Sequence, residues 1–370
     1  MLFSDFVSKI LFSYIFGCSG LRNLALELET NPVCKELGLS KTPFSTLKDG
    51  FSRFEGQKFK LLFENVLSNI SLLQSSYLDE LGIFNVIDGS LFPTLLPTNW
   101  TSYRKNKNAF KMHFCFELNR MIATEFWVGN GHSCERTIFT QMVHKGITYI
   151  ADRGYFSFDI ALKVSSSDAF FILRLKDNML FNVENRLDVT GENFPICFRN
   201  SSDSIGKFTN DIHQSNIRIV RFEVWGNAFV IATNRLDLTT FQIILLYAYR
   251  WQIELFFKYL KRTLKGCHLL NNTENGVQIQ FYLLLTLALL ELHLKQTCQA
   301  IKNISYFFSD YERKSTEVYQ FTGQSPSSWI KNAAKPFYIF WKISKAWLTV
   351  LKSNIAQLFD NEIIAILSTA

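Results

Sequence analysis

Residues 147–175 read ITYIADRGYFSFDIALKVSSSDAFFILRL. The stretch opens with an apolar, β-branched run, Ile147–Ala151, which predicts a strand that ends at Asp152. Apolar residues then recur at helical spacing from about Ser157 to Ser166, and a second apolar run, Ala169–Leu175, predicts another strand. A strand, a helix and a strand in this order are typical of an α/β fold.

The residues before this stretch predict three further strands. Ile83–Ile87 is a compact apolar run that ends at Asp88, and the runs Met112–Leu118 and Met121–Val128 are joined by a short turn. A helix over about Ser133–His144 leads into the stretch quoted above. Three strands followed by alternating helices and strands predict an α/β sheet with mixed strand directions.

The residues after it predict a β-rich insertion and two long helices. Residues 177 to about 235 hold short strand candidates, such as Ile217–Val224 and Ala228–Thr233, and no convincing helix. One helix follows from about Thr239 to Lys265, closed by Gly266, and another from about Thr273 to Ala300. Polar residues interrupt the apolar part of the second helix, so we expect a buried core helix and no membrane span.

The two ends of the chain differ from this pattern. Short helices joined by polar turns are expected over residues 1–75, with basic residues in their second half. This region is predicted to be a helical DNA-binding domain, and a solvated helix face is the alternative interpretation of its charges. Residues 76–300 then form the α/β domain with its insertion. Residues 301–370 are aromatic and basic, are expected to be helical, and are a candidate for dimerisation.

The composition indicates a chain with a large core and a modest basic excess. Of its 370 residues, 48% are apolar and 19% are charged, which excludes global disorder. The net charge of +7 fits a nucleic-acid partner without requiring one. Seven scattered cysteines without a C-x-x-C pair argue against a structural zinc site and indicate reduced thiols in a cytosolic protein.

The helix predicted over Thr239–Lys265 carries one narrow polar stripe. At about 100° per residue, with Tyr247 set at zero, Arg250 falls at about −60° and Glu254 at about −20°. Four more basic residues lie within about 60° of Tyr247: Lys258, Lys261, Arg262 and Lys265. Two interpretations of this stripe are open: Glu254 forms an i,i+4 ion pair with Lys258, or the stripe forms a site for a metal and phosphates. The surplus of cations around one carboxylate favours the site.

Two aspartates each follow a predicted strand. Asp88 stands in Val86-Ile87-Asp88-Gly89-Ser90, and Asp152 stands in Ala151-Asp152-Arg153-Gly154-Tyr155. Side chains at the ends of α/β strands line the crevice where ligands bind. An aspartate after a strand is also a common turn or cap residue, but two of them together with the Glu254 stripe favour a functional site.

Taken together, these motifs resemble the bacterial insertion-sequence transposases of the IS4 type, which have a DDE catalytic core. The third motif of that family, Tyr-x2-Arg-x3-Glu-x6-Lys, is complete here as Tyr247, Arg250, Glu254 and Lys261. The first and second motifs resemble Asp88-Gly89-Ser90 and Asp152-Arg153-Gly154-Tyr155, and a β-rich stretch before the glutamate is typical of the family. The resemblance covers about residues 40–300.

The resemblance implies a ribonuclease-H-like mixed sheet and catalytic, metal-binding roles for Asp88, Asp152 and Glu254. Two Mg²⁺ ions, for which Mn²⁺ can substitute, would serve the cleavage and joining of phosphodiester bonds. The implied partners are double-stranded DNA, both terminal inverted repeats and target, and a second copy of the chain when two ends are paired. A cytoplasmic, nucleoid-associated bacterial protein is expected.

The resemblance also implies DNA contacts. Tyr247, Arg250 and Lys261 would hold phosphates beside the cleavage site, and Arg153 and Lys258 are further candidates. Trp225 precedes Gly226-Asn227, which suits a tight hairpin turn. A Trp at such a tip could stack on a flipped base, as in some family members, with ordinary packing as the alternative. His113 matches a position where these transposases often carry Lys-x-His, but no chemical role follows for it.

Two other functions stay open at this point. A metal-dependent nuclease of the same fold would cut DNA without joining ends. A non-catalytic DNA-binding protein derived from a transposase would bind DNA without cutting it, although the complete set of acidic residues and the intact Tyr-Arg-Glu-Lys pattern argue against decay.

Overall fold

The computed structural model describes residues 1–70, 72, 76–94, 102–104, 107–130, 134–176, 179–189, 198–224, 227–264 and 268–297. Four expectations from the sequence lie outside these residues: the helical region 301–370, the stacking residue Trp225, the stripe residue Lys265 and the helix-closing Gly266.

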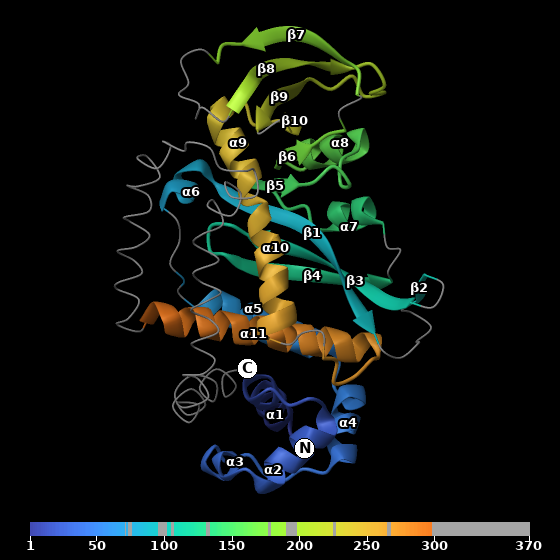
Figure 1. The fold of residues 1–370 in the computed structure, drawn as a ribbon, viewed down its shortest axis with the longest axis vertical. Coiled ribbons are helices and arrows are strands. Elements are labelled where there is room, and N and C mark those ends of the chain that lie inside the picture. Colours follow the sequence, from blue (N-terminus) through green and yellow to red (C-terminus); the bar gives the residue numbers. More distant parts are fainter. Residues whose placement is uncertain are drawn as a thin grey trace.

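A mixed sheet forms the centre of the molecule (Figure 1). Its central strands are arranged in the order β4–β3–β1–β5–β6. Their bounds are Ile83–Thr94 for β1, Lys107–Glu117 for β3, Ile122–Asn130 for β4, Ile147–Ala151 for β5 and Phe170–Arg174 for β6. β1, β5 and β6 run parallel to one another, whereas β3 is antiparallel to both β1 and β4. The short β2, Ser102–Arg104, pairs with the start of β3. This arrangement confirms the predicted α/β sheet of ribonuclease-H-like type.

β1 is longer than the sequence predicts. The expected strand end at Asp88 is wrong, because residues from Asp88 to Thr94 continue to pair with β3. On the other edge of β1, the pairing with β5 ends at Val86. Asp88 therefore lies inside a strand, just past the point where β1 stops pairing with β5 and the sheet opens.

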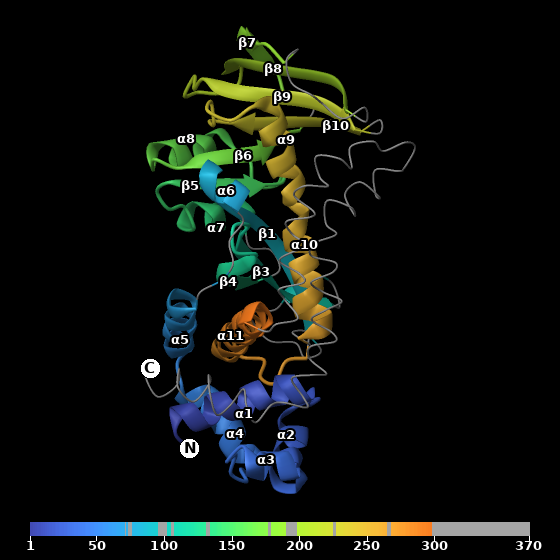
Figure 2. The ribbon, with the colours of Figure 1, turned by 90° about the vertical axis from the view of Figure 1, so that its left-hand side faces the viewer.

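Two apolar cores cover the two faces of the sheet. Successive strand residues point to opposite faces, so Phe84 and Val86 of β1 join one core while Ile87 joins the other. α7 (Glu135–Gln141) and α8 (Phe158–Ser166) lie on the Ile87 face, and α9 and α10 lie on the opposite face (Figure 2). Both predicted helices between the first five strands are present, although α7 is shorter than expected.

The helix that was expected as one piece over Thr239–Lys265 has three parts: α9 (Thr240–Tyr249), α10 (Trp251–Lys258) and the π-helical turn η1 (Tyr259–Thr263). α9 begins with a capping box between Thr239 and Gln242. At the junction, the N–H groups of Arg250 and Ile253 bond carbonyls three residues back instead of four, which tightens the helix. After Lys258 the helix widens, and the Leu264 N–H bonds the Tyr259 carbonyl five residues back.

Four strands extend the sheet beyond β6 and form the predicted β-rich insertion. They are β7 (Phe181–Leu187), β8 (Phe198–Phe208), β9 (Ile217–Val224) and β10 (Asn227–Thr233), and β10 pairs antiparallel with β6. A buried ion pair fixes this insertion to the start of α9. Arg218 of β9 donates to the Asp203 carboxylate and to the carbonyls of Arg235 and Leu238, and the Thr240 hydroxyl donates to Asp203.

Helices precede the sheet, as expected for residues 1–75. Their bounds are Phe3–Phe16 for α1, Leu21–Thr30 for α2, Pro32–Glu36 for α3, Phe44–Arg53 for α4, Gly56–Asn69 for α5 and Ser76–Leu81 for α6. The breaks fall where the sequence predicts them, at Gly17–Gly20, Asn31–Pro32 and Lys41–Pro43. These helices do not enclose a core of their own, because Phe6, Phe51 and Phe59 belong to the same apolar core as Phe281 and Leu285 of α11 (Glu274–Thr297).

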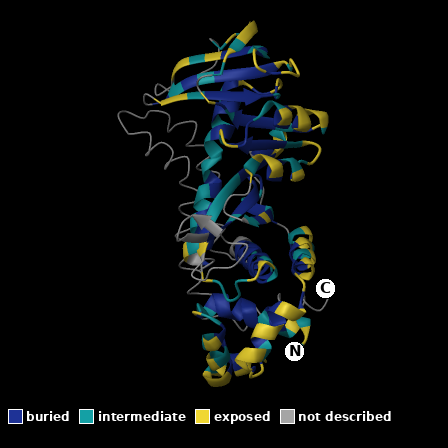
Figure 3. Ribbon diagram, turned by 90° about the vertical axis from the view of Figure 1, so that its right-hand side faces the viewer, coloured by how far each residue is buried: buried dark blue, intermediate teal, exposed yellow. Residues whose placement is uncertain are grey.

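α11 is the long apolar helix that was expected near residue 277. Its segment Glu274–His293 has the length and hydropathy of a membrane-spanning helix, but 89% of an 18-residue window within it is buried in the fold. It packs against α1, α4, α5 and β4, and Figure 3 shows it among the buried elements. The prediction of a buried core helix is confirmed.

Candidate active site

Asp88 reaches the α10 side of the sheet from the middle of β1. Its Oδ1 accepts a hydrogen bond from the N–H of Gly89 at 2.7 Å, and its Oδ2 lies 3.5 Å from Nη1 of Arg250. Only 23% of the side chain is exposed. The carboxylate is thus mostly withdrawn from water and has one cation beside it.

Asp152 follows the last residue of β5. Its Oδ1 accepts from the Arg153 N–H at 2.8 Å and from the Tyr247 hydroxyl at 3.3 Å. Nη1 of Arg174, at the end of the neighbouring strand β6, lies 4.0 Å from the same oxygen. Because β5 and β6 are parallel neighbours, their carboxyl ends place these two side chains together.

Glu254 lies on α10, and Arg250 joins it to Asp88. Nη2 of Arg250 donates to Oε1 of Glu254 at 3.0 Å, while Nη1 of the same guanidinium lies near Asp88. Tyr247, one turn before Arg250, contacts Asp152. The polar stripe predicted for this helix therefore contacts all three acidic residues: Tyr247 contacts Asp152, and Arg250 contacts Asp88 and Glu254.

The charges of the three carboxylates also affect one another. Burial is the main reason that the pKa of Asp88 is raised to about 6; Arg250 and the Gly89 N–H lower it, and Glu254 and Asp152 raise it. Burial likewise raises the pKa of Glu254, against the effect of Arg250, and Asp152 adds to the rise. Such mutual repulsion in a partly buried site is what a bound cation relieves.

Lys261, the last residue of the Tyr-Arg-Glu-Lys motif, lies in the π-turn. Its Nζ donates to Oγ of Ser90 at 2.6 Å and to the Leu91 carbonyl at 2.8 Å, and it lies 4.6 Å from the centre of the Phe92 ring. These contacts fix the end of the helix to the part of β1 that follows Asp88.

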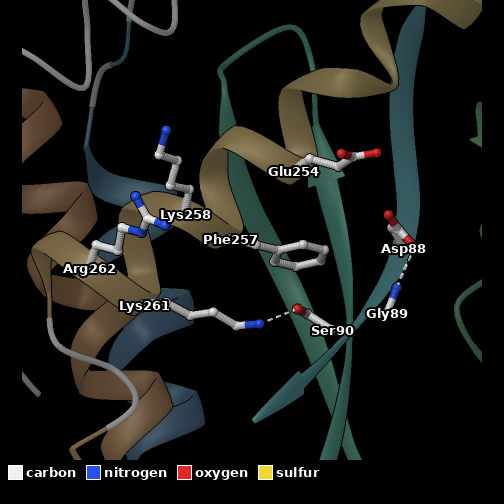
Figure 4. A pocket seen from close by; sticks show the side chains of 8 residues that line it. All are labelled: Asp88, Gly89, Ser90, Glu254, Phe257, Lys258, Lys261 and Arg262. Atoms are coloured by element: carbon white, nitrogen blue, oxygen red, sulfur yellow. Dashed lines mark hydrogen bonds between the residues drawn. The ribbon is translucent and has the colours of Figure 1, made fainter.

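A pocket of about 500 Å³ lies between β1 and the helix. Figure 4 shows its lining, with Asp88 and Glu254 at one end and the basic side chains toward the other. The lining residues are Asp88, Gly89, Ser90, Glu254, Phe257, Lys258, Lys261 and Arg262. Acidic and basic groups in one open pocket suit a ligand that combines a metal with phosphates.

The donor set fits a hard divalent cation in its chemistry, since three carboxylates supply oxygen ligands of the kind that Mg²⁺ and Mn²⁺ prefer. Within the described residues, no group of three or more His, Cys, Asp or Glu side chains is gathered closely enough to hold a metal ion. Arg250 instead takes the place of a cation between Asp88 and Glu254. A metal held by these two carboxylates would compete with this guanidinium.

The other predicted site residues fall in different places. Lys258 lines the pocket and is half-buried, whereas Arg153 is exposed beside Asp152 and is not among the pocket residues. Trp225 lies outside the described residues. His113 lies on β3, next to Gly89 of β1, and is fully buried. Its Nδ1 lies 3.0 Å from the Tyr155 hydroxyl.

Arg174 is a site residue that sequence reasoning missed. Besides its contact with Asp152, its guanidinium lies 4.6 Å from the centre of the Phe229 ring, and its Nε is buried without a hydrogen-bond partner in the described part of the chain. The sequence does hold a signal, because Arg174 stands at the end of β6 much as Asp152 stands directly after β5. A single basic residue at a strand end is too common to stand out without the fold.

Comparisons with known proteins agree with this geometry. A model of the transposase DDE domain matches residues 82–290, which is more than half of the chain. The chain is 27% identical over 207 residues to y4zB of Sinorhizobium fredii, which is named as a transposase; the match covers 54% of this chain and 57% of that protein. It is 22% identical over 247 residues to a protein of Geobacillus stearothermophilus named as the transposase for insertion sequence element IS5377, with 66% of this chain and 63% of that protein covered.

The chain thus spans about three-fifths of the length of these curated relatives. The segment that matches the domain model begins just before β1 and ends within α11, so it includes Asp88, Asp152 and Glu254. The chain belongs to the family of DDE transposases.

Proposed function

We propose that this chain is a transposase of the IS4 type, which cuts phosphodiester bonds at the ends of its own element and joins those ends to target DNA. One observation carries the proposal. Asp88, Asp152 and Glu254 come from two strands and a helix, yet Tyr247 and Arg250 contact all three. Three acidic residues that lie 64 and 102 residues apart in the sequence (152−88 and 254−152) are thus served by one polar stripe, which supports a shared role.

The three carboxylates would hold two Mg²⁺ ions, or Mn²⁺ in their place. When bound, such a pair supplies activation of an attacking hydroxyl and stabilisation of the leaving oxygen. Arg250 would release Asp88 and Glu254 as DNA enters, because a phosphate offers its guanidinium a new anionic partner. The carboxylates then become free to act as ligands.

The basic end of the pocket would hold the DNA backbone. Lys258, Lys261 and Arg262 line it, and each can neutralise one phosphate. Burial raises the pKa of Tyr247 to about 12, so its hydroxyl stays protonated near neutral pH and can donate to a phosphate. Arg153, exposed next to Asp152, would add a contact outside the pocket.

Other regions would complete the reaction on double-stranded DNA. Residues 1–75 would bind the terminal inverted repeats, residues 301–370 would hold two copies of the chain together on paired ends, and Trp225 would stack on an extruded base. The protein would work in the bacterial cytoplasm at the nucleoid. The net charge of +7 supports DNA as the partner.

The test combines the full chain with Mg²⁺, a target plasmid and a labelled duplex from the DNA that flanks its gene. Wild-type protein should cut the duplex at the end of the element and join it to the plasmid. Asp88→Asn, Asp152→Asn and Glu254→Gln should each lower cleavage roughly a thousandfold or more and still bind the duplex. Asp168→Asn is the matched control, because Asp168 is exposed, lies far from the pocket residues in sequence and has a positive φ that Asn tolerates.

Three results would contradict the proposal in different ways. Cutting without joining would identify a nuclease of the same fold. Binding with no cutting in either Mg²⁺ or Mn²⁺ would identify a DNA-binding protein derived from a transposase. Cleavage retained by Asp152→Asn would refute the assignment of the acidic residues.

A further inference from the structure

We propose that Lys111, His113, Glu135 and Tyr155 are positioning residues that hold the backbone around Asp88 and Asp152 at the separation that metal binding requires. The inference rests on the proposed function. It concerns side chains on the face of the sheet opposite α10. Within the described residues, none of the four lines the pocket, so each would act through the two aspartates.

These four side chains form a polar layer on that face of the sheet. Gly89 and Gly154, the glycines that follow the two aspartates, show where this layer touches the backbone. A Cβ added at Gly89 would lie 2.8 Å from Cε of Lys111 and 3.0 Å from Nδ1 of His113, and a Cβ added at Gly154 would overlap with Oε2 of Glu135. Neither glycine has a positive φ. A side chain at either position would displace the end of Lys111 or Glu135, because these polar side chains pack against the backbone at Gly89 and Gly154.

An ion pair connects the two sides of this layer. Nζ of Lys111, on β3, lies 2.5 Å from Oε1 of Glu135, in the first turn of α7. Their side chains are 16% and 32% exposed, so water screens the pair only in part. Lys111 lies against β1 beside Asp88, and Glu135 lies against the turn that carries Asp152. The pair thus links the two aspartate segments through side chains from two other elements.

A buried hydrogen bond fixes the Asp152 turn itself. The Tyr155 N–H bonds the Asp152 carbonyl at 3.0 Å and closes the turn. The Tyr155 side chain is 2% exposed, and its hydroxyl lies 3.0 Å from Nδ1 of His113, which is fully buried opposite Gly89 on β3. His113 therefore holds the far end of the Asp152 turn while its own strand supports β1. This gives the Lys-x-His pair on β3 a role that its sequence alone does not suggest.

Groups that orient metal ligands typically change metal affinity by about 10- to 100-fold when they are removed. We expect Gly154→Ala, which changes no charge, to weaken Mn²⁺ binding to the full chain by about that factor. The readout is the electron paramagnetic resonance signal of free Mn²⁺ in a titration without DNA. The reason for the expected loss is that the added methyl group would push the Glu135 carboxylate away from Lys111 and weaken their ion pair.

A charge exchange tests the ion pair independently. Glu135→Lys should weaken Mn²⁺ binding about tenfold or more, and adding Lys111→Glu should restore most of it. Glu80→Lys, the same charge change on an exposed residue of α6, is the control and should stay within about twofold of wild type. Thermal denaturation of every variant distinguishes a weakened metal site from a loss of folding, and the charge-exchanged double variant remains informative if a single variant does not fold.

Unchanged Mn²⁺ affinity in both Gly154→Ala and Glu135→Lys would overturn the positioning role and leave the proposed function intact. Failure of Glu135→Lys with Lys111→Glu to recover affinity, with folding retained, would overturn it as well. Asp152→Asn serves as the reference for the metal site. If it bound Mn²⁺ as tightly as wild type, the metal site of the proposed function would fail and this inference with it.

Discussion

Arg250 bridges two acidic residues of the pocket, because its guanidinium lies between the carboxylates of Asp88 and Glu254, which repel each other. A hydrogen bond to a charged group contributes about 1.5–3 kcal/mol, and a metal ion must break such bonds before it can bind Asp88 and Glu254. We expect Arg250→Gln to bind Mn²⁺ about tenfold more tightly than wild type in the absence of DNA, which corresponds to about 1.4 kcal/mol. A titration followed by the resonance of free Mn²⁺ measures the difference.

Arg136→Gln provides the control for this substitution, since Arg136 is exposed on α7. Its Mn²⁺ affinity should equal that of wild type. If Arg250→Gln bound Mn²⁺ no better than the control, the guanidinium would not compete with the metal for the carboxylates.

His113 should make the stability of the protein depend on pH. Burial, together with the nearby Lys111 charge, lowers the pKa of His113 to about 4 from its ordinary value of 6.5. Between pH 6.5 and pH 4, His113 is protonated in the unfolded chain but neutral in the folded chain. The free energy of unfolding is therefore unaffected by His113 above pH 6.5, and it decreases as the pH drops toward 4. The loss amounts to about 3 kcal/mol at most.

His113→Gln removes this titration and can still hydrogen-bond Tyr155. Urea unfolding at pH 7 and pH 4 should show a smaller loss of unfolding free energy for His113→Gln than for wild type. Equal losses in the two proteins would mean that His113 is protonated in the folded chain. All other titrating groups are shared, so the difference belongs to His113.

Some site residues can be identified from the sequence and others cannot, depending on whether their contacts are local. The stripe of Tyr247, Arg250 and Glu254 follows from helical geometry within one segment, so spacing alone reveals it. Arg174 meets Asp152, and Glu135 meets the turn at Gly154, only because β6 and α7 are assembled beside β5. No local pattern encodes such contacts.

At the scale of elements, a buried ion pair holds the β-rich insertion to the start of α9, and its loss should destabilise the fold. Arg218 and Asp203 are 4% and 0% exposed, and Arg218 also donates to two carbonyls just before α9. Removing one partner of a buried pair costs about 3–5 kcal/mol, because the other charge stays buried. We therefore expect Arg218→Met to lower the free energy of unfolding in urea by that amount.

Two further variants decide whether the ion pair is the cause. Asp203→Asn added to Arg218→Met should cost less than Arg218→Met alone, because no unpaired charge remains. Arg221→Met, on the same strand but only partly buried, should change little. Additive effects of Arg218→Met and Asp203→Asn would contradict the proposed coupling between β8, β9 and α9.

Element boundaries were predictable where one segment supplies the whole signal. β5, β9 and the start of α8 match the sequence patterns closely, because apolar runs and the Ser157 cap mark them locally. β1 runs past its predicted end because pairing with β3, a distant segment, continues it. The long helix changes its hydrogen bonding at Arg250 and after Lys258, where the 3.6-residue pattern alone gives no warning.

For the whole molecule, the most consequential contact joins the N-terminal helices to α11, more than 200 residues away in the sequence. The Asn275 side chain donates to the carbonyls of Phe51 and Phe54 and accepts from the Gly56 N–H. The apolar core on both sides of this contact is continuous. A boundary at about residue 75, which composition suggests, therefore does not separate two cores.

We expect the N-terminal helices and the α/β region to unfold together. Asn275→Ala removes three hydrogen bonds at about 0.5–1.5 kcal/mol each, so it should lower the free energy of unfolding by about 2–4 kcal/mol. In native-state hydrogen–deuterium exchange, peptides from α4, α5 and α11 should lose protection together. Asn69→Ala is the matched control, because its side chain bonds only within α5 on the exposed surface in the described structure. Faster exchange confined to α4 and α5, with α11 unchanged, would instead identify the N-terminal helices as an independently folding domain.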